Sequence, residues 1–245
     1  MVDEGQSALQ SAMVEATDTE RSTIETLLTI GRWITLLAES LSDYGAALEI
    51  LRRAETYFEN KQFEDASTQS NRAVEKVKAS RAHYQQATNL YGEIDVSTLE
   101  PLGEVSSDIR TGLHSLRERG DRLDTYANAV NKLAISLHSL SIGRNYYIQA
   151  KTAANDGDLD TAQNELKRAS AAFSEAITAA NDGEEIAPNA ILGSFIELSC
   201  KSEHVQDATD SLLSAISARQ AGDDAEADTH LSQAATAERQ AANCE

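Results

Sequence analysis

Three stretches of the chain carry alanines at the same two intervals. In each stretch the second alanine follows the first by twelve residues, and the third follows the second by seven. The nine positions are Ala54, Ala66 and Ala73, then Ala150, Ala162 and Ala169, and then Ala215, Ala227 and Ala234. A fixed internal spacing of this kind is typical of a repeated structural unit. We therefore expect three related units in this chain.

The apolar residues around these alanines recur at helical spacing. In the first unit they step alternately by four and three residues, which is the heptad pattern of closely packed helices. This heptad stripe consists of Ile30, Ile34, Leu37, Leu41, Tyr44, Leu48 and Leu51. Arg144 interrupts the stripe in the second unit, and Ser202 stands at a stripe position in the third. Strand-like alternation is not evident, so the sequence predicts an all-α protein.

Two prolines mark the boundaries between the units, because a proline inside a helix costs roughly 3 kcal/mol. Pro101 and Pro188 each follow a glycine, Gly92 or Gly183, that is predicted to end a helix. The segment 181–185 is accordingly interpreted as a linker. The predicted organisation is an N-terminal segment at 1–17, a first helical hairpin unit at 18–92, a linker at 93–103, a second hairpin unit at 104–183 and a third, shorter one at 184–245.

The predicted turn of each hairpin lies between the first and second alanines. Gly157 and Gly222 can adopt the left-handed conformation that ends a helix. Asp158 and Asp223 follow them and can cap the next helix, where acidic residues also oppose the helix dipole. We expect these acidic turns to cap helices rather than to bind calcium, because the glycine and the final glutamate of a calcium loop are missing.

These turn regions resemble tetratricopeptide repeats, which have a small residue, a turn and two further spaced alanines. The matching residues are Ala54, Tyr57, Phe63, Ala66 and Ala73, then Ala150, Gly157, Asp158, Leu159, Ala162, Leu166 and Ala169, and then Ala215, Gly222, Asp223, Ala227, Leu231 and Ala234. The resemblance implies an elongated bundle of three long helix-turn-helix hairpins with tetratricopeptide-like elbows. It also implies a binding groove lined by one set of positions in each unit. These are Leu51, Glu55, Phe58 and Glu59, then Tyr147, Lys151, Ala154 and Asn155, and then Leu212, Ile216, Arg219 and Gln220.

The charge balance excludes several classes of partner. The chain has 21 basic and 40 acidic residues and a formal net charge of -19. Nucleic acids and anionic membranes are bound through basic residues, so neither is an expected partner. The composition resembles that of proteins from halophilic archaea, in which molar salt screens the repulsion between carboxylates.

The N-terminus gives an expectation about the compartment. Met1-Val2-Asp3-Glu4 does not resemble an export signal, and the longest apolar stretch is too short to span a membrane. A cytoplasmic protein is therefore expected. A chain from which an export signal had been removed would look the same, so an exported protein is the alternative.

The residues that most often carry chemistry form no recognisable pattern. The five histidines show no metal-ligand spacing, and phosphate-loop and nucleophile motifs are missing. The two cysteines do not make a disulfide framework, and the apolar surroundings of Cys200 predict a small core residue. The sequence therefore predicts no catalytic residue, no metal and no cofactor, and we expect this protein not to be an enzyme.

The predicted function is that of a non-catalytic scaffold or protein-protein interaction module. A helical sensor or regulatory domain that binds a small ligand between hairpins is the alternative. The candidate partner-binding residues are Arg144, Tyr146, Tyr147, Lys151 and Phe58. The stripe interruptions at Arg144 and Ser202 are expected to mark the partner face, and a homodimer could form along the heptad stripe.

Overall fold

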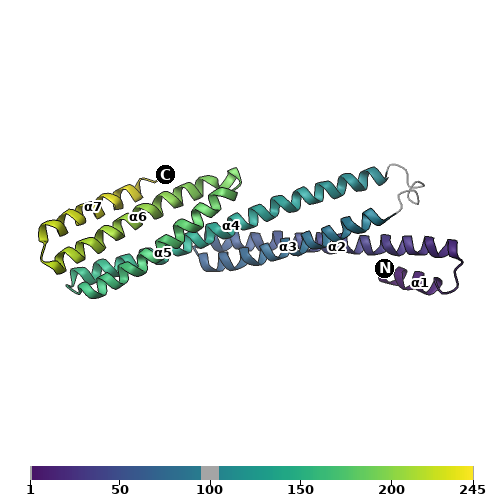
Figure 1. The fold of residues 1–245 in the computed structure, drawn as a ribbon, viewed down its shortest axis with the longest axis horizontal. Helices are drawn as coiled ribbons and strands as arrows, with labels where there is room; N and C mark the ends of the chain where they lie inside the picture. The colour runs from purple at the N-terminus through teal and green to yellow at the C-terminus, as the bar shows by residue number, and fades with distance from the viewer. Residues whose placement is uncertain (1, 95–104, 245) are drawn as a thin grey trace. The chain divides into compact units, whose positions relative to one another are not determined.

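The structure is a computed structural model that describes residues 2–94 and 105–244. All secondary structure in these ranges is helical, which confirms the all-α prediction (Figure 1). The helices are α1 (Val2–Ala12), α2 (Asp18–Glu59), α3 (Phe63–Glu93), α4 (Val105–Asn155), α5 (Leu159–Ile186), α6 (Asn189–Ala221) and α7 (Asp224–Ala242). The predicted linker at 93–103 lies outside the described residues, apart from Glu93 and Ile94. Across the described ranges, no helix is long and apolar enough to cross a membrane.

The chain divides into two compact units, each formed by segments that are distant in sequence. The first consists of Met1–Arg52 and Arg72–Asp124, and the second of Arg53–Asn71 and Thr125–Glu245. Helices α2, α3 and α4 are continuous across this division and contribute residues to both units.

The nine alanines of the triplicated spacing are all buried, and none is more than 2% exposed. Helix backbones can approach closely only where the side chains between them are short. The recurring alanines therefore mark helix contacts, as their spacing predicts.

Two glycines of the second compact unit lie at helix contacts that are closer than those at the alanines. A Cβ atom added to Gly143 on α4 would lie 2.4 Å from Cε1 of Phe173 on α5, and one added to Gly183 on α5 would lie 2.0 Å from Cε1 of Phe195 on α6. Both phenylalanines are fully buried, and they belong to one core cluster. Each phenylalanine ring fills the space that the side chain of any residue larger than glycine would need.

This packing corrects the interpretation of residues 181–185 as a linker. Helix α5 passes through Gly183 and ends at Ile186, before the extended Ala187 and Pro188. The proline ends the helix as predicted, because the residue before a proline is disfavoured in the helical conformation. Gly183 does not end it, because its missing side chain is needed for the contact with Phe195.

The turns adopt the local conformations predicted from their residue types. Gly157 and Gly222 have φ angles of 83° and 81°. At the start of α5, Asp158 accepts a hydrogen bond from the backbone N–H of Thr161 at 3.0 Å, and Asp223 does the same for α7. In the turn between α2 and α3, the equivalent left-handed position is occupied by Lys61, with a φ angle of 58°.

The core of the first unit is built around Trp33, Ala87, Ile94 and Leu113. Elsewhere in this unit, the buried hydroxyls of Ser40 on α2 and Ser80 on α3 each donate a hydrogen bond to the other residue's backbone carbonyl.

The two rows of the α2 heptad stripe differ in burial, since one is half-buried or buried and the other is exposed. Ile30 and Leu37 pack against the Trp33 core, and Leu51 is 3% exposed. The other row, Ile34, Leu41 and Leu48, is 44%, 53% and 37% exposed. The expectation of a closely packed stripe is therefore wrong for this row, because the neighbouring helices cover only one edge of it.

Candidate functional site

A small apolar pocket lies in the second compact unit, between the end of α4 and helices α5, α6 and α7. Its volume is about 180 Å³. The apolar lining residues are Ala150, Ala154, Leu159, Leu166, Leu212, Ala215, Ile216 and Leu231, and the polar ones are Lys151, Asn155 and Arg219. The lining includes six of the eight groove positions that the tetratricopeptide resemblance implies in the second and third hairpin units, but not Tyr147 or Gln220.

Part of the pocket lining belongs to the buried core. Ala150, Leu166 and Ile216 form a buried cluster with Ala162. Two of the repeated alanines, Ala150 and Ala215, line the pocket. Because these side chains are short, they leave space between α4 and α6 that a larger residue would fill.

The polar side of the pocket carries two basic residues, Lys151, which is paired with a carboxylate, and Arg219. The Nζ atom of Lys151 lies 2.8 Å from Oε1 of Glu238, and it also lies 5.5 Å from the centre of the Tyr147 ring. Arg219 is exposed in the last turn of α6. A ligand that carries an anionic group beside an apolar one would complement this lining.

A hydrogen-bonded group beside the pocket links α4 to α7. The Tyr147 hydroxyl donates to Oε1 of Glu238 at 2.6 Å, the oxygen that also accepts from Lys151. Burial and the neighbouring carboxylate raise the pKa of Tyr147, so its hydroxyl keeps its proton. Burial alone would raise the pKa of Glu238, but the hydrogen bonds from Lys151 and Tyr147 outweigh it and hold that pKa below its ordinary value.

The structure brings together some of the predicted partner-binding residues and not others. Lys151 lines the pocket, and Tyr147 shares Glu238 with it. Tyr146 packs against the core cluster, with the guanidinium of Arg168 at 5.7 Å from its ring centre. Arg144 is exposed and does not line the pocket. Phe58 packs beside Phe63 at the α2–α3 turn, with ring centres 6.3 Å apart.

The expectation that Ser202 marks a partner face is wrong. Ser202 is fully buried. Helix α6 packs against both α5 and α7, and Figure 1 shows it lying between them. A residue that interrupts an apolar stripe can therefore still face a neighbouring helix, and here the small serine does so.

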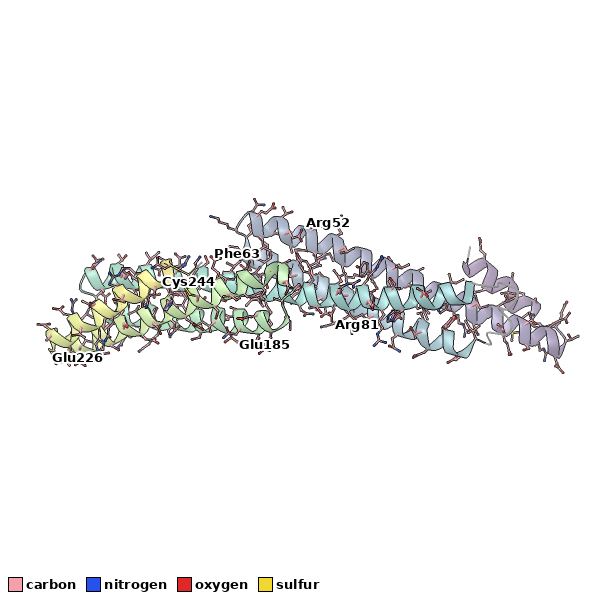
Figure 2. The ribbon with its side chains drawn as sticks, turned by 90° about the horizontal axis from the view of Figure 1, so that it is seen from above. Arg52, Phe63, Arg81, Glu185, Glu226 and Cys244 are labelled. Atoms are coloured by element: carbon pink, nitrogen blue, oxygen red, sulfur yellow. A yellow bond between two sulfur atoms is a disulfide. The ribbon has the colours of Figure 1, made fainter. Side chains whose placement is uncertain are left out.

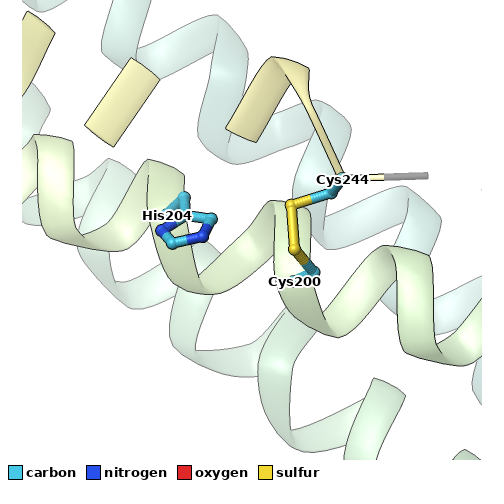
Figure 3. A group of neighbouring side chains, drawn as sticks. All are labelled: Cys200, His204 and Cys244. Atoms are coloured by element: carbon cyan, nitrogen blue, oxygen red, sulfur yellow. A yellow bond between two sulfur atoms is a disulfide. The ribbon is translucent and has the colours of Figure 1, made fainter. Parts of the chain in front are cut away.

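The cysteines also differ from the prediction. Cys200 is not an isolated core residue, because it forms a disulfide with Cys244. Figure 2 shows Cys244 at the end of α7 opposite to Glu226. His204 lies beside this pair, one turn along α6 from Cys200, as Figure 3 shows. The sequence prediction overlooked the four-residue spacing of Cys200 and His204, which places both on one helix face, and nothing in the sequence links this pair to Cys244.

The chain matches no protein-family model, no curated protein and no solved structure.

Proposed function

We propose that this chain is a non-catalytic protein-protein interaction module that binds a segment of a protein partner at the pocket between α4, α5, α6 and α7. The observation that carries the proposal is an apolar pocket with cationic residues on its polar side, in a chain whose net charge is -19. The segment would place one apolar side chain in the pocket and an adjacent carboxylate near Lys151 and Arg219.

The size of the pocket favours a side chain over a larger ligand. Sites for drug-sized molecules usually enclose about 300–1,000 Å³, whereas this pocket encloses about 180 Å³. A single aliphatic or aromatic side chain fits such a volume, and the rest of a bound segment would lie along the exposed residues around it.

The proposed architecture behind this function is three tetratricopeptide-like hairpins, α2–α3, α4–α5 and α6–α7. The buried alanines and the left-handed turn positions at Lys61, Gly157 and Gly222 support it. The pocket then joins the second and third hairpins at positions corresponding to the groove of that family.

A sensor that binds a small anion is the second candidate, and one feature favours it. Lys151 belongs to α4 and Arg219 to α6. An anion held by both side chains would couple the α4–α5 pair to the α6–α7 pair. The pocket volume limits such a ligand to a few non-hydrogen atoms.

We propose that the acidic excess is an adaptation to molar salt, and that the protein acts in the cytoplasm. A cytoplasmic protein holds its cysteines mainly as thiols, whereas an exported one keeps its disulfide. Intact cells of the source organism are quenched in acid, and alkylation in denaturant with a zinc chelator and no reductant then distinguishes the two compartments by the fraction of Cys200 that is modified.

The interaction proposal is tested by photo-crosslinking in the source cells. A photoreactive residue at the exposed Gln220, beside Arg219, is expected to capture one protein at a defined segment, while the same residue at the exposed Glu175 of α5 captures none. A synthetic peptide of the captured segment is then titrated against the purified protein at matched salt concentration.

Charge reversal supplies the matched control for that titration. Arg219→Glu is expected to weaken peptide binding about tenfold or more, the loss of one good charge-assisted contact. Lys167→Glu makes the same charge change at an exposed position of α5 that does not line the pocket, and should leave binding unchanged. Equal weakening by the two variants, or identical crosslinks at both sites, would refute the proposal.

A further inference from the structure

Three potential metal ligands converge where the end of α7 meets α6. Cys200 and His204 are four residues apart on α6, which places them on the same face of the helix. Cys244 follows the end of α7. One ligand atom from each of the three residues lies within 4.8 Å of the other two (Figure 3).

The imidazole of His204 has an unused polar atom in this cluster. Its Nδ1 is buried and has no hydrogen-bond partner. The nearest acidic group is the carboxylate of Asp207, whose Oδ2 lies 3.8 Å away. A buried polar atom without a hydrogen-bond partner destabilises the folded protein, so the position of His204 Nδ1 needs an explanation.

We propose that reduced Cys200 and Cys244, together with His204, form a Zn²⁺ site that the disulfide closes. Two thiolates and an imidazole are ligands that zinc prefers, and they disfavour calcium and magnesium. None of the three residues lines the apolar pocket, so this site is separate from the proposed partner-binding site.

The dimensions of the cluster suit a tetrahedral ion. Zn–S bonds of about 2.3 Å and Zn–N bonds of about 2.0–2.1 Å place neighbouring ligand atoms roughly 3.5–3.8 Å apart. One ligand atom of each residue already lies within 4.8 Å of those of the other two, so small side-chain rotations after reduction would complete the site. Cys244 is buried while Cys200 and His204 are half-buried, which leaves the fourth position open to water.

Metal binding also gives the unpartnered imidazole nitrogen a role. With Nε2 bound to zinc, the neutral ring carries its proton on Nδ1 and can donate it to Asp207. A carboxylate that accepts from a ligating histidine is a common supporting contact at zinc sites. Closing the present 3.8 Å separation to hydrogen-bonding distance needs only a change in the Asp207 side chain, which is exposed.

The two states are related by a balanced exchange. A dithiol reductant transfers two electrons and two protons to the Cys200–Cys244 disulfide, becoming a disulfide itself and leaving two thiols. Zn²⁺ then displaces one proton from each thiol and binds the two thiolates and His204. In either state a covalent or coordinate link joins α6 to the end of α7, so the link persists when the redox state changes.

The site is tested with Co²⁺, a spectroscopic substitute for zinc, on the full chain with and without prior reduction. One equivalent is expected to give thiolate-to-cobalt charge-transfer absorption and tetrahedral ligand-field bands in the reduced protein, and Zn²⁺ should abolish both. The oxidised protein is the control for weak binding by its many carboxylates, which produces no charge-transfer band.

Single substitutions test the contribution of the proposed ligands and of Asp207 to metal binding. Cys200→Ser should abolish the charge-transfer spectrum of the intact site, and His204→Gln should weaken Zn²⁺ binding more than about 100-fold. Asp207→Asn should weaken it about 10-fold, the lower end of the range for a supporting carboxylate. His230→Gln is the matched control, because His230 lies on α7 beside Glu226 and Gln233, away from the cysteines in sequence.

Three results would overturn the proposal. They are the absence of charge-transfer absorption in the reduced wild-type protein, unchanged zinc affinity in His204→Gln, and equal affinity in the oxidised protein. Circular dichroism monitors folding throughout. A loss of helicity on reduction that one equivalent of Zn²⁺ reverses supports the site, and a loss that Zn²⁺ does not reverse counts against it.

Discussion

Replacing Gly183 by alanine tests whether the close contact between α5 and α6 specifies their packing. The added Cβ atom would lie 2.0, 2.5 and 2.6 Å from three atoms of the Phe195 ring. Ordinary van der Waals contact between carbon atoms needs about 3.5–4.0 Å, so the Phe195 ring would have to move by roughly 1 Å or more. Phe195 is fully buried, and close-packed neighbours leave little room for that movement.

The expected cost follows from two opposing effects. Overpacking a core costs about 1–3 kcal/mol, and a contact this short belongs at the upper end. Alanine recovers about 1 kcal/mol of helix propensity. The net expectation is a loss of about 2 kcal/mol, which lowers the melting temperature by roughly 4–8 °C in a chain of this size.

The assay is urea unfolding followed by circular dichroism, with Gly193→Ala as the matched control. Gly193 lies on α6 and a Cβ there meets nothing within 4 Å, so its replacement should stabilise by about 0.5–1 kcal/mol. Phe195→Leu combined with Gly183→Ala should recover part of the loss, giving a favourable coupling energy. If Gly183→Ala stabilises the protein as much as Gly193→Ala does, the packing argument is refuted.

Three further predictions concern the turns, the pocket and the surface. Lys61→Gly should stabilise the protein by about 1 kcal/mol, because a left-handed backbone is unfavourable for lysine, and Gly222→Lys should destabilise it by a similar amount. Urea unfolding midpoints measure both changes, and stability changes of the same sign in the two variants would contradict the reasoning. The pKa of Glu238 is lowered from its ordinary 4.5 in the folded state, so its ionised form stabilises the fold above that pH and loses this effect as the pH falls through the lowered value. Glu238→Gln should therefore be less stable than wild type at neutral pH, with a difference that narrows on acidification, and a pH-independent difference would contradict this assignment. If the charge of -19 is a salt adaptation, melting temperature should rise steeply from low to molar KCl, and a flat response would exclude it.

The sequence predicted those features that depend on one helix or one turn. The helical class followed from apolar spacing, and the buried alanines followed from their repetition. Gly157 and Gly222 were predictable because few residues adopt a left-handed backbone at low cost. Asp158 and Asp223 were predictable because a cap joins residues only three positions apart.

The features that needed the tertiary structure join residues far apart in the chain. The Tyr147–Glu238 hydrogen bond spans 91 positions, and the Cys200–Cys244 disulfide spans 44. Periodicity shows that a helix has an apolar face, but it does not show which neighbours cover that face or how completely. For this reason Ser202 is buried where a partner face was expected, and one row of the α2 stripe is exposed where close packing was expected. Local residue types determined the helices and turns, and packing between distant helices decided the pocket, the disulfide and the cluster around His204.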